Sequence, residues 1–177
     1  MLAGRWVLVI LMVLLGPLLW WTGVSDTAAT AHAAAAPGDA DGHYFIANYD
    51  GPGRAVAGFF AFINLVLLGV LMPTIRHLRT NRTGTYARAI VTALLAIGLA
   101  WFEYVANPVT TNWGGDPDAW SMVQDHIVPW YGSLAGIWIV LVVATGTTIA
   151  GSALTAAISA HRARAQPPVV EVDNDLG

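Results

Sequence analysis

The chain has 177 residues and a formal net charge of −3, and 56% of its residues are hydrophobic while only 11% are charged, against roughly 25% charged residues in a soluble globular domain. So little polar surface excludes a water-soluble enzyme, the absence of Cys excludes disulfides and thiolate metal ligands, and the slight acidity provides no basic patch for nucleic acid. The composition therefore predicts an integral membrane protein, with the lipid bilayer as its solvent and no nucleic-acid partner.

Four apolar runs approach or exceed the length of about 20 residues that a helix needs to cross a bilayer core about 30 Å thick. They lack charges in their central parts and cover residues 6–21, 55–75, 87–106 and 127–152. The first run is the shortest and leads into Ala31-His32-Ala33, which resembles a signal-peptidase site. The Trp20-Trp21 pair is instead typical of an interfacial anchor. Cleavage therefore stays open, and we favour a retained anchor.

The arginines predict the orientation of these runs. If the chain crosses four times, seven of its eight basic residues fall on one side and only Arg54 falls on the other. The seven are Arg5, Arg76, Arg79, Arg82, Arg88, Arg162 and Arg164. Because basic flanks stay in the cytoplasm, the sequence predicts an all-α bundle of four transmembrane helices in the plasma membrane, with both termini cytoplasmic. Its parts are an N-terminal anchor or uncleaved signal (1–23), an extracytoplasmic linker (24–53), a three-helix membrane domain (54–160) and a disordered tail (161–177).

Three residues inside these runs are predicted to pack helices together. Asn64 is the only strongly polar side chain near the middle of the second run, and an amide in hydrocarbon finds a partner across a helix interface. A role in a binding site is the alternative. Gly132 and Gly136 form a G-x-x-x-G step that lets another helix approach closely. That helix belongs either to this chain or to another.

Glu103, near the outer end of the third run, is the main candidate for chemistry. An intramembrane carboxylate is a functional hypothesis by default because its ionised form is costly there, and a protonated carboxyl can act as a general acid. An interfacial structural role is the alternative. Asp125 and His126, at the entry to the fourth run, are candidate proton partners or simply the polar start of a helix. No metal-ligand spacing is present, so we expect no metal and no cofactor.

Several short motifs resemble the AveC-type spirocyclase family of actinobacterial membrane proteins, over roughly residues 42–115. They are Gly42-His43-Tyr44-Phe45, Gly51-Pro52, the turn with Arg76, Arg79 and Arg82, and Trp101-Phe102-Glu103 followed by Asn107-Pro108. The resemblance implies spiroketal formation or related tailoring of a lipid or polyketide at the outer membrane face. It implies that Glu103 is the acid, with Asn107, Trp101, Tyr104 and Trp113 around the substrate. This chain is shorter than that family and has Glu where Asp is expected.

A second, local likeness concerns the entry to the fourth run. Residues 126–133, His-Ile-Val-Pro-Trp-Tyr-Gly-Ser, are similar to a helix start in the C subunit of copper membrane monooxygenases, where the matching His binds copper. The upstream Asp-x-x-x-His pair that completes that copper site is missing here. This likeness implies a non-catalytic accessory or assembly subunit of a larger membrane complex. The sequence thus leaves two functions open, an enzyme acting on a hydrophobic small molecule and an accessory subunit.

Overall fold

The computed structural model describes residues 2–77, 83–113 and 115–165, and all regular structure within these ranges is helical. In chain order the elements are α1 (Leu2–Val9), the π-helical segment η1 (Ile10–Leu15), α2 (Gly16–Ala34), α3 (Ala40–His77), α4 (Thr83–Val105), α5 (Pro117–Val123), the 3-10 turn η3 (Gln124–His126) and α6 (Pro129–Ala165). The expected all-α class is confirmed for the described residues.

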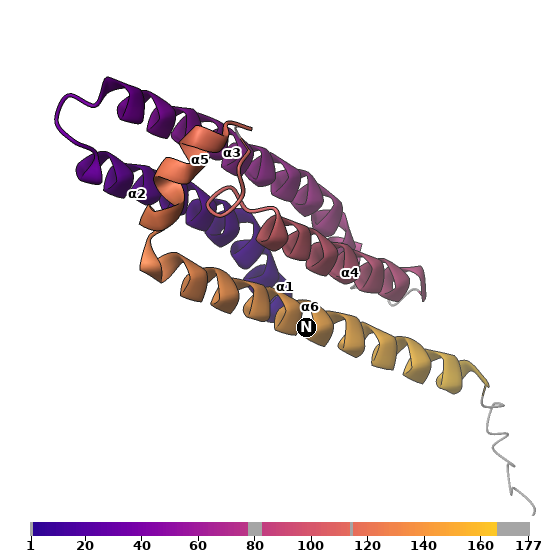
Figure 1. Ribbon diagram of the computed structural model, residues 1–177. Coiled ribbons are helices and arrows are strands. Elements are labelled where there is room, and N and C mark those ends of the chain that lie inside the picture. Colours follow the sequence, from indigo (N-terminus) through magenta and orange to yellow (C-terminus); the bar gives the residue numbers. More distant parts are fainter. Residues whose placement is uncertain (1, 78–82, 114, 166–177) are drawn as a thin grey trace, which may run out of the picture.

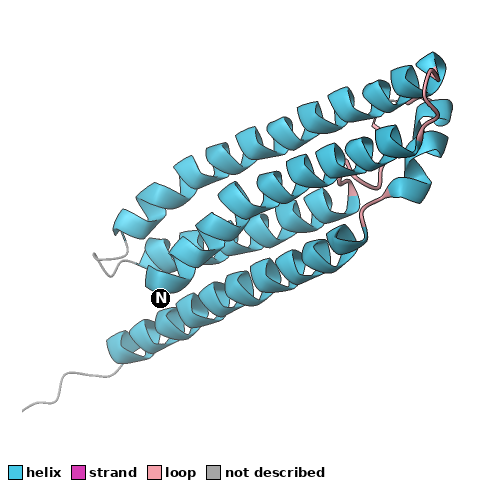
Figure 2. Cartoon of the chain, turned by 90° about the vertical axis from the view of Figure 1, so that its left-hand side faces the viewer, coloured by secondary structure: helices cyan, strands magenta, loops and turns pink. Residues whose placement is uncertain are grey.

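The long helices form one bundle, in which α1, η1 and α2 make a continuous rod (Figure 1). Within the bundle, α4 packs along α6 and α2 packs along α3. Figure 2 shows the long helices running side by side, and in Figure 1 the short helix α5 lies across one end of them. The interior is built from aromatic and small side chains, among them Trp20, Val24, Phe60, Ala96, Ala100, Tyr131, Trp138 and Val142.

In the part of the chain that the structure describes, three helices are long and apolar enough to cross a membrane: Gly4–Ala34, Tyr86–Val105 and Pro129–Ala165. They correspond to the first, third and fourth predicted crossings. The second predicted crossing, residues 55–75, lies on α3, and the side chains of residues 68 and 70–77 are outside the described part of the chain. The basic turn at Arg79 and Arg82 also lies outside it, as does the predicted tail beyond residue 165. Within the described residues, the structure therefore establishes an all-helical architecture with three helices long and apolar enough to cross a membrane.

Most of the segment expected to be a linker, residues 24–53, is helical. α2 continues to Ala34, α3 begins at Ala40, and the connection between them covers only residues 35–39. Alanine is the strongest helix former, and Ala28 and Ala31 also bury their side chains in the core of the bundle. The alanine tract therefore extends α2 beyond the predicted anchor.

The π-helical segment explains how the first rod continues through Gly16-Pro17. A proline inside an α-helix removes one backbone hydrogen bond and crowds the preceding turn, and a π-turn is one way for a helix to absorb such a defect. The wider turn also makes backbone carbonyls accessible to other helices. Trp138 of α6 donates its indole N–H to the Leu11 carbonyl at 2.7 Å, and Asn64 of α3 donates its amide N–H to the Met12 carbonyl at 2.9 Å.

Candidate functional site

Glu103 lies in the interior of the bundle and is fully buried. Its carboxyl oxygen Oε2 accepts a hydrogen bond from the indole N–H of Trp20 on α2 at 3.3 Å. The other oxygen, Oε1, has no hydrogen-bond partner. No ion pair to Glu103 occurs among residues 2–77, 83–113 and 115–165. The carboxyl group is therefore held by a neutral donor in an enclosed, largely apolar environment.

Asn64 brings α3 to the same region. It is fully buried, its Nδ2 donates to the Met12 carbonyl, and its amide lies near the Glu103 carboxyl. Its carbonyl oxygen Oδ1 has no partner. Side chains from α2, α3 and α4 thus meet at one polar point, which we call the Glu103 cluster (Trp20, Asn64 and Glu103).

Aromatic rings enclose the Glu103 cluster. The ring of Trp20 packs edge-on against Trp138 with centroids 5.1 Å apart, and against Tyr131 with centroids 5.9 Å apart. Trp20 and Tyr131 are almost completely buried. These rings fill the space between α2 and α6 at the level of Glu103. The aromatic packing therefore separates the carboxyl group from the outside of the bundle.

Asp125 and His126 lie outside this interior. Both belong to η3, before α6 begins at Pro129, and Asp125 is exposed. His126 Nδ1 lies 3.1 Å from the carbonyl oxygen of Met122, one turn earlier in the chain. Neither side chain makes a described contact with Glu103. The predicted acid and its predicted proton partners are thus on different parts of the molecule.

Asn107 organises the turn that follows α4. Its Oδ1 accepts hydrogen bonds from the backbone N–H of Val109 and Thr110 and from the Thr110 hydroxyl, while its Nδ2 donates to the Tyr104 carbonyl. The amide is therefore occupied by local structure. Asn–Pro sequences commonly initiate turns in this way. A role for Asn107 in holding substrate stays a prediction.

The three predicted aromatic substrate contacts lie toward the surface. Trp101 is exposed, and its ring packs beside Tyr104 with centroids 6.0 Å apart. Trp113 is also exposed, and its indole N–H donates to the Ala106 carbonyl at 2.9 Å. Tyr104, Asn107 and Gly132 line one groove of about 530 Å³ between the end of α4 and the start of α6. The structure therefore brings these three predicted residues together, but it leaves Glu103 outside that groove.

Gly132 and Gly136 have open space beside them. A Cβ added at either position would meet no atom within 4 Å, counting the described residues beyond the helix's own nearby backbone. The close helix approach occurs instead at Gly146, where an added Cβ would lie 2.8 Å from Ile97 of α4. Gly23 is a second such point, because a Cβ there would lie 2.8 Å from the Tyr131 ring. Sequence spacing alone did not identify these two packing glycines.

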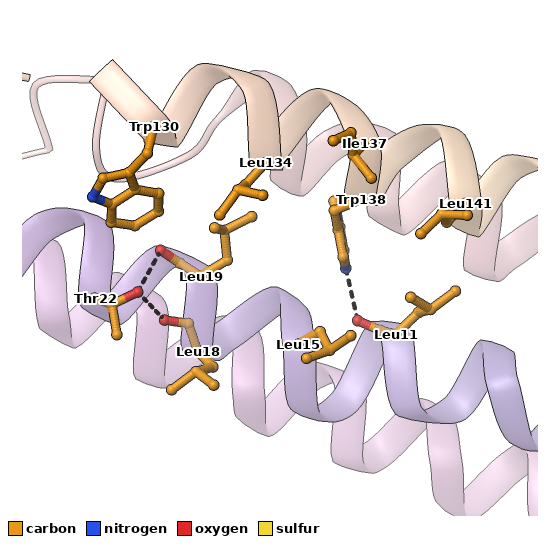
Figure 3. A pocket seen from close by; sticks show the side chains of 10 residues that line it. All are labelled: Leu11, Leu15, Leu18, Leu19, Thr22, Trp130, Leu134, Ile137, Trp138 and Leu141. Carbon is orange, nitrogen blue, oxygen red and sulfur yellow. Dashed lines mark hydrogen bonds between the residues drawn. The ribbon is translucent and has the colours of Figure 1, made fainter. Parts of the chain in front are cut away.

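An apolar hollow lies between the first rod and α6 (Figure 3). We call it the α2–α6 groove. Its volume is about 410 Å³, and its lining residues are Leu11, Leu15, Leu18, Leu19, Thr22, Trp130, Leu134, Ile137, Trp138 and Leu141. The only hydroxyl among them, that of Thr22, donates to the Leu18 and Leu19 carbonyls. The groove therefore presents almost nothing but hydrocarbon and aromatic surface.

A pair of histidines at the α2–α3 connection was not anticipated. The Nδ1 atoms of His32 and His43 are 2.8 Å apart, and their rings stack with centroids 5.0 Å apart. One ring nitrogen can donate to the other when the two imidazoles adopt opposite tautomers. No third His, Asp, Glu or Cys completes a metal-binding group anywhere in the described ranges. The pair therefore joins the ends of two helices.

Comparison with known proteins gives no relative. No protein-family model matches the chain. No curated protein and no solved structure matches it either. The functional proposal therefore rests on the residues and contacts of this chain.

Proposed function

We propose that this chain is a multi-pass plasma-membrane protein that holds the apolar chain of a lipid or polyketide-like molecule in the α2–α6 groove. The observation that carries the proposal is the groove itself, whose volume of about 410 Å³ lies within the range of about 300–1,000 Å³ typical of ligand pockets. Its leucine and isoleucine side chains come from both walls (Figure 3). Inside a bilayer the binding energy comes from close dispersion contacts, because the surrounding lipid is already apolar.

The enclosure of Glu103 favours binding over acid catalysis. A general acid must lie within hydrogen-bond reach of the group that it protonates. Glu103 is fully buried, the indole N–H of Trp20 on α2 donates to it, and it lines neither of the two grooves described above. A spirocyclase-type acid at this position would need the Trp20 contact to open first. The buried carboxyl is better explained as a polar contact that orients α2, α3 and α4.

The proposal includes four crossings, with α3 as the second and with both termini in the cytoplasm. The outward side chains on the described part of α3 are large and apolar, namely Phe59, Phe62, Leu65 and Val66. Such a face suits lipid contact. Arg54, the one basic residue on the proposed outer side, forms an ion pair with Asp50 and lies over the ring of Trp21 with its guanidinium carbon 5.8 Å from the ring centroid. Its charge is therefore offset locally.

Cysteine labelling tests this orientation cleanly. The chain has no Cys of its own, so only an introduced Cys can react with the label. We expect Ala36→Cys and Asp118→Cys to react with a membrane-impermeant maleimide added to intact cells. Gly84→Cys and Ala165→Cys should react only after the cells are permeabilised. All four positions are exposed. Labelling of Gly84→Cys in intact cells would refute the crossing by α3, because positions 36 and 84 lie on either side of it.

Filling the groove tests the binding function. Leu134→Trp places a larger ring between the groove walls, and we expect the amount of co-purified lipid or other apolar ligand to fall about tenfold, which corresponds to about 1.4 kcal/mol. Leu94→Trp is the matched control, because Leu94 is similarly exposed on α4 but lines none of the described grooves. The ligand is quantified by mass spectrometry of organic extracts from protein purified in mild detergent. Equal ligand content in the two variants would contradict the proposal.

A second function, that of an accessory subunit, is favoured by the open space at Gly132 and Gly136. Small residues four positions apart allow a helix to approach closely, and the chain's own described helices leave this face uncovered. A helix of a larger membrane complex would fit there. This function and the binding of an apolar molecule use different surfaces, because neither glycine lines the α2–α6 groove.

A further inference from the structure

Two histidine side chains meet where α2 is connected to α3. His32 lies in the last turn of α2 and His43 near the start of α3, on either side of the connection 35–39, which forms the loop at the far end of these helices in Figure 1. Their Nδ1 atoms are 2.8 Å apart, and their ring planes differ by 27°. Both side chains are partly exposed. The contact therefore joins the two helix ends at a point that protons from solution can reach.

The two rings meet end to end. The separation of the ring centroids exceeds the separation of the Nδ1 atoms by 2.2 Å (5.0 − 2.8), which is about twice the distance from the centre of an imidazole ring to one of its nitrogens. The two nitrogens therefore lie almost on the line between the ring centres. A metal ion on this line would need about 2.0–2.1 Å on each side, more than the gap provides. The contact is thus a hydrogen bond in which one Nδ1 donates and the other accepts.

This hydrogen bond tolerates one added proton but not two. In the neutral pair, the donating ring carries its proton on Nδ1 and the accepting ring carries its proton on Nε2. The first added proton binds the free Nε2 of the donating ring, which leaves a charge-assisted hydrogen bond in place. The second must bind the accepting Nδ1 itself, because no other ring nitrogen is free. Two protonated rings then present N–H groups and positive charges to each other, so the contact opens.

No carboxylate neutralises the doubly protonated pair directly. Among residues 2–77, 83–113 and 115–165, no Asp or Glu oxygen lies within 4.0 Å of a nitrogen of either histidine. Asp39, one turn before His43, instead accepts the backbone N–H of Gly42 at 2.9 Å. The titratable and charged side chains on this end of α2 and α3, and on the short helices packed against it, are those of Asp26, Asp39, Asp41, Tyr44, Tyr49, Asp50, Arg54, Asp116, Asp118, Asp125 and His126. Repulsion between two protonated rings is therefore not offset by an ion pair.

We propose that His32 and His43 form a pH-sensitive latch that holds the ends of α2 and α3 together at neutral pH and releases them in acid. The open state binds one proton more than the closed state can hold, so a falling pH favours opening. Histidine changes its charge between about pH 5 and 8. Neither residue lines the α2–α6 groove, so the latch does not depend on the proposed binding function. In the proposed orientation it responds to the pH outside the cell.

Spin labels on the two helices measure the opening. Ala29→Cys and Ala47→Cys place the labels at exposed positions of α2 and α3, and pulsed electron paramagnetic resonance gives their separation in the full-length protein in a maltoside detergent. We expect the separation to increase by several ångström between about pH 7.5 and about pH 5, and to return when the pH is raised. Labels at Leu94→Cys of α4 and Val140→Cys of α6, both exposed, should keep their separation, because the bundle itself stays packed.

Matched variants remove one histidine at a time from the protein labelled on α2 and α3. His32→Gln and His43→Gln should each abolish the change in separation, because only one titratable ring then remains at the contact. His126→Gln is the control. Its ring lies against the Met122 carbonyl rather than against the pair, so this variant should keep the full response.

Four outcomes would overturn the latch. An equal α2–α3 separation at both pH values in the protein with both histidines would do so without any further variant. A response that survives in His32→Gln or His43→Gln, or is lost in His126→Gln, would assign it to another titratable group. An equal change between α4 and α6 would mean that the whole bundle loosens in acid. Opening at about pH 7.5 on addition of EDTA would replace the hydrogen bond with a bound metal ion.

Discussion

Replacing Trp20 with alanine is expected to lower the free energy of unfolding by about 3–5 kcal/mol. Trp20 is completely buried and contacts two other helices of the bundle: its ring packs on Tyr131 and Trp138 of α6, and its N–H donates to Glu103 of α4. The substitution would leave a cavity between α2 and α6 and remove the hydrogen bond that Trp20 donates to the Glu103 carboxyl. In a chain of this size the thermal midpoint should fall by roughly 10 °C.

Trp21→Ala is the matched control for this prediction. The neighbouring tryptophan is 46% exposed and contacts the guanidinium of Arg54 near the surface. Its loss should change the midpoint by only a few degrees, because no cavity forms in the core. Both variants are measured by thermal unfolding in the same detergent. Similar midpoints for Trp20→Ala and Trp21→Ala would show that the interior described here is not the one that stabilises the protein.

Gly146→Ile is expected to separate α4 from α6 and to destabilise the bundle by about 1–3 kcal/mol or more. Even a Cβ at this position would lie 2.8 Å from the Ile97 side chain and 3.5 Å from the Ala93 carbonyl oxygen. Ile97 can move by a rotamer change, but the backbone of α4 cannot. A branched side chain must therefore displace the whole helix. The midpoint should fall, and resistance to unfolding by added SDS should fall with it.

Gly132→Ile carries the same substitution on the same helix and serves as the control. Nothing lies within 4 Å of a Cβ at Gly132, and isoleucine is a better helix former than glycine. We expect the stability of the isolated protein to be unchanged or slightly higher. Equal destabilisation by Gly132→Ile and Gly146→Ile would contradict the α4–α6 packing. Release of a membrane complex by Gly132→Ile, at unchanged stability, would support the accessory function.

The helical architecture could be predicted from the sequence because the constraint is simple. A chain with so few charged residues must form helices whose length matches the bilayer, and three of the expected apolar runs fall on helices capable of crossing. The continuation of α2 through the alanine tract could not be predicted from hydropathy, since alanine is only weakly apolar. It depends on the burial of Ala28 and Ala31 against other helices, which is a tertiary property.

The candidate site was only partly predictable. Glu103 and Asn64 were identified because polar side chains are unusual in a membrane run, but their common location depends on how α3 and α4 pack around the π-helical segment. Trp20 was interpreted as an interfacial anchor, whereas it is the buried donor to Glu103. A tryptophan near the end of an apolar run gives the same sequence pattern whether it lies at the membrane interface or in the core of the bundle. The grooves were not predictable, because each is formed between helices that are distant in the sequence.

The central claim, that an apolar molecule lies in the α2–α6 groove, is tested most directly by photo-crosslinking. A fatty acid carrying a terminal diazirine is added to membranes containing the protein, and the labelled residues are identified by peptide mass spectrometry. We expect labelling to concentrate on the groove walls at Leu134, Ile137 and Leu141 of α6, each of which is also exposed. Equally exposed residues on α4, such as Leu94 and Leu95, should be labelled several-fold less. Equal labelling of the two helices would mean that the groove contains only ordinary bilayer lipid, and it would contradict the proposed function.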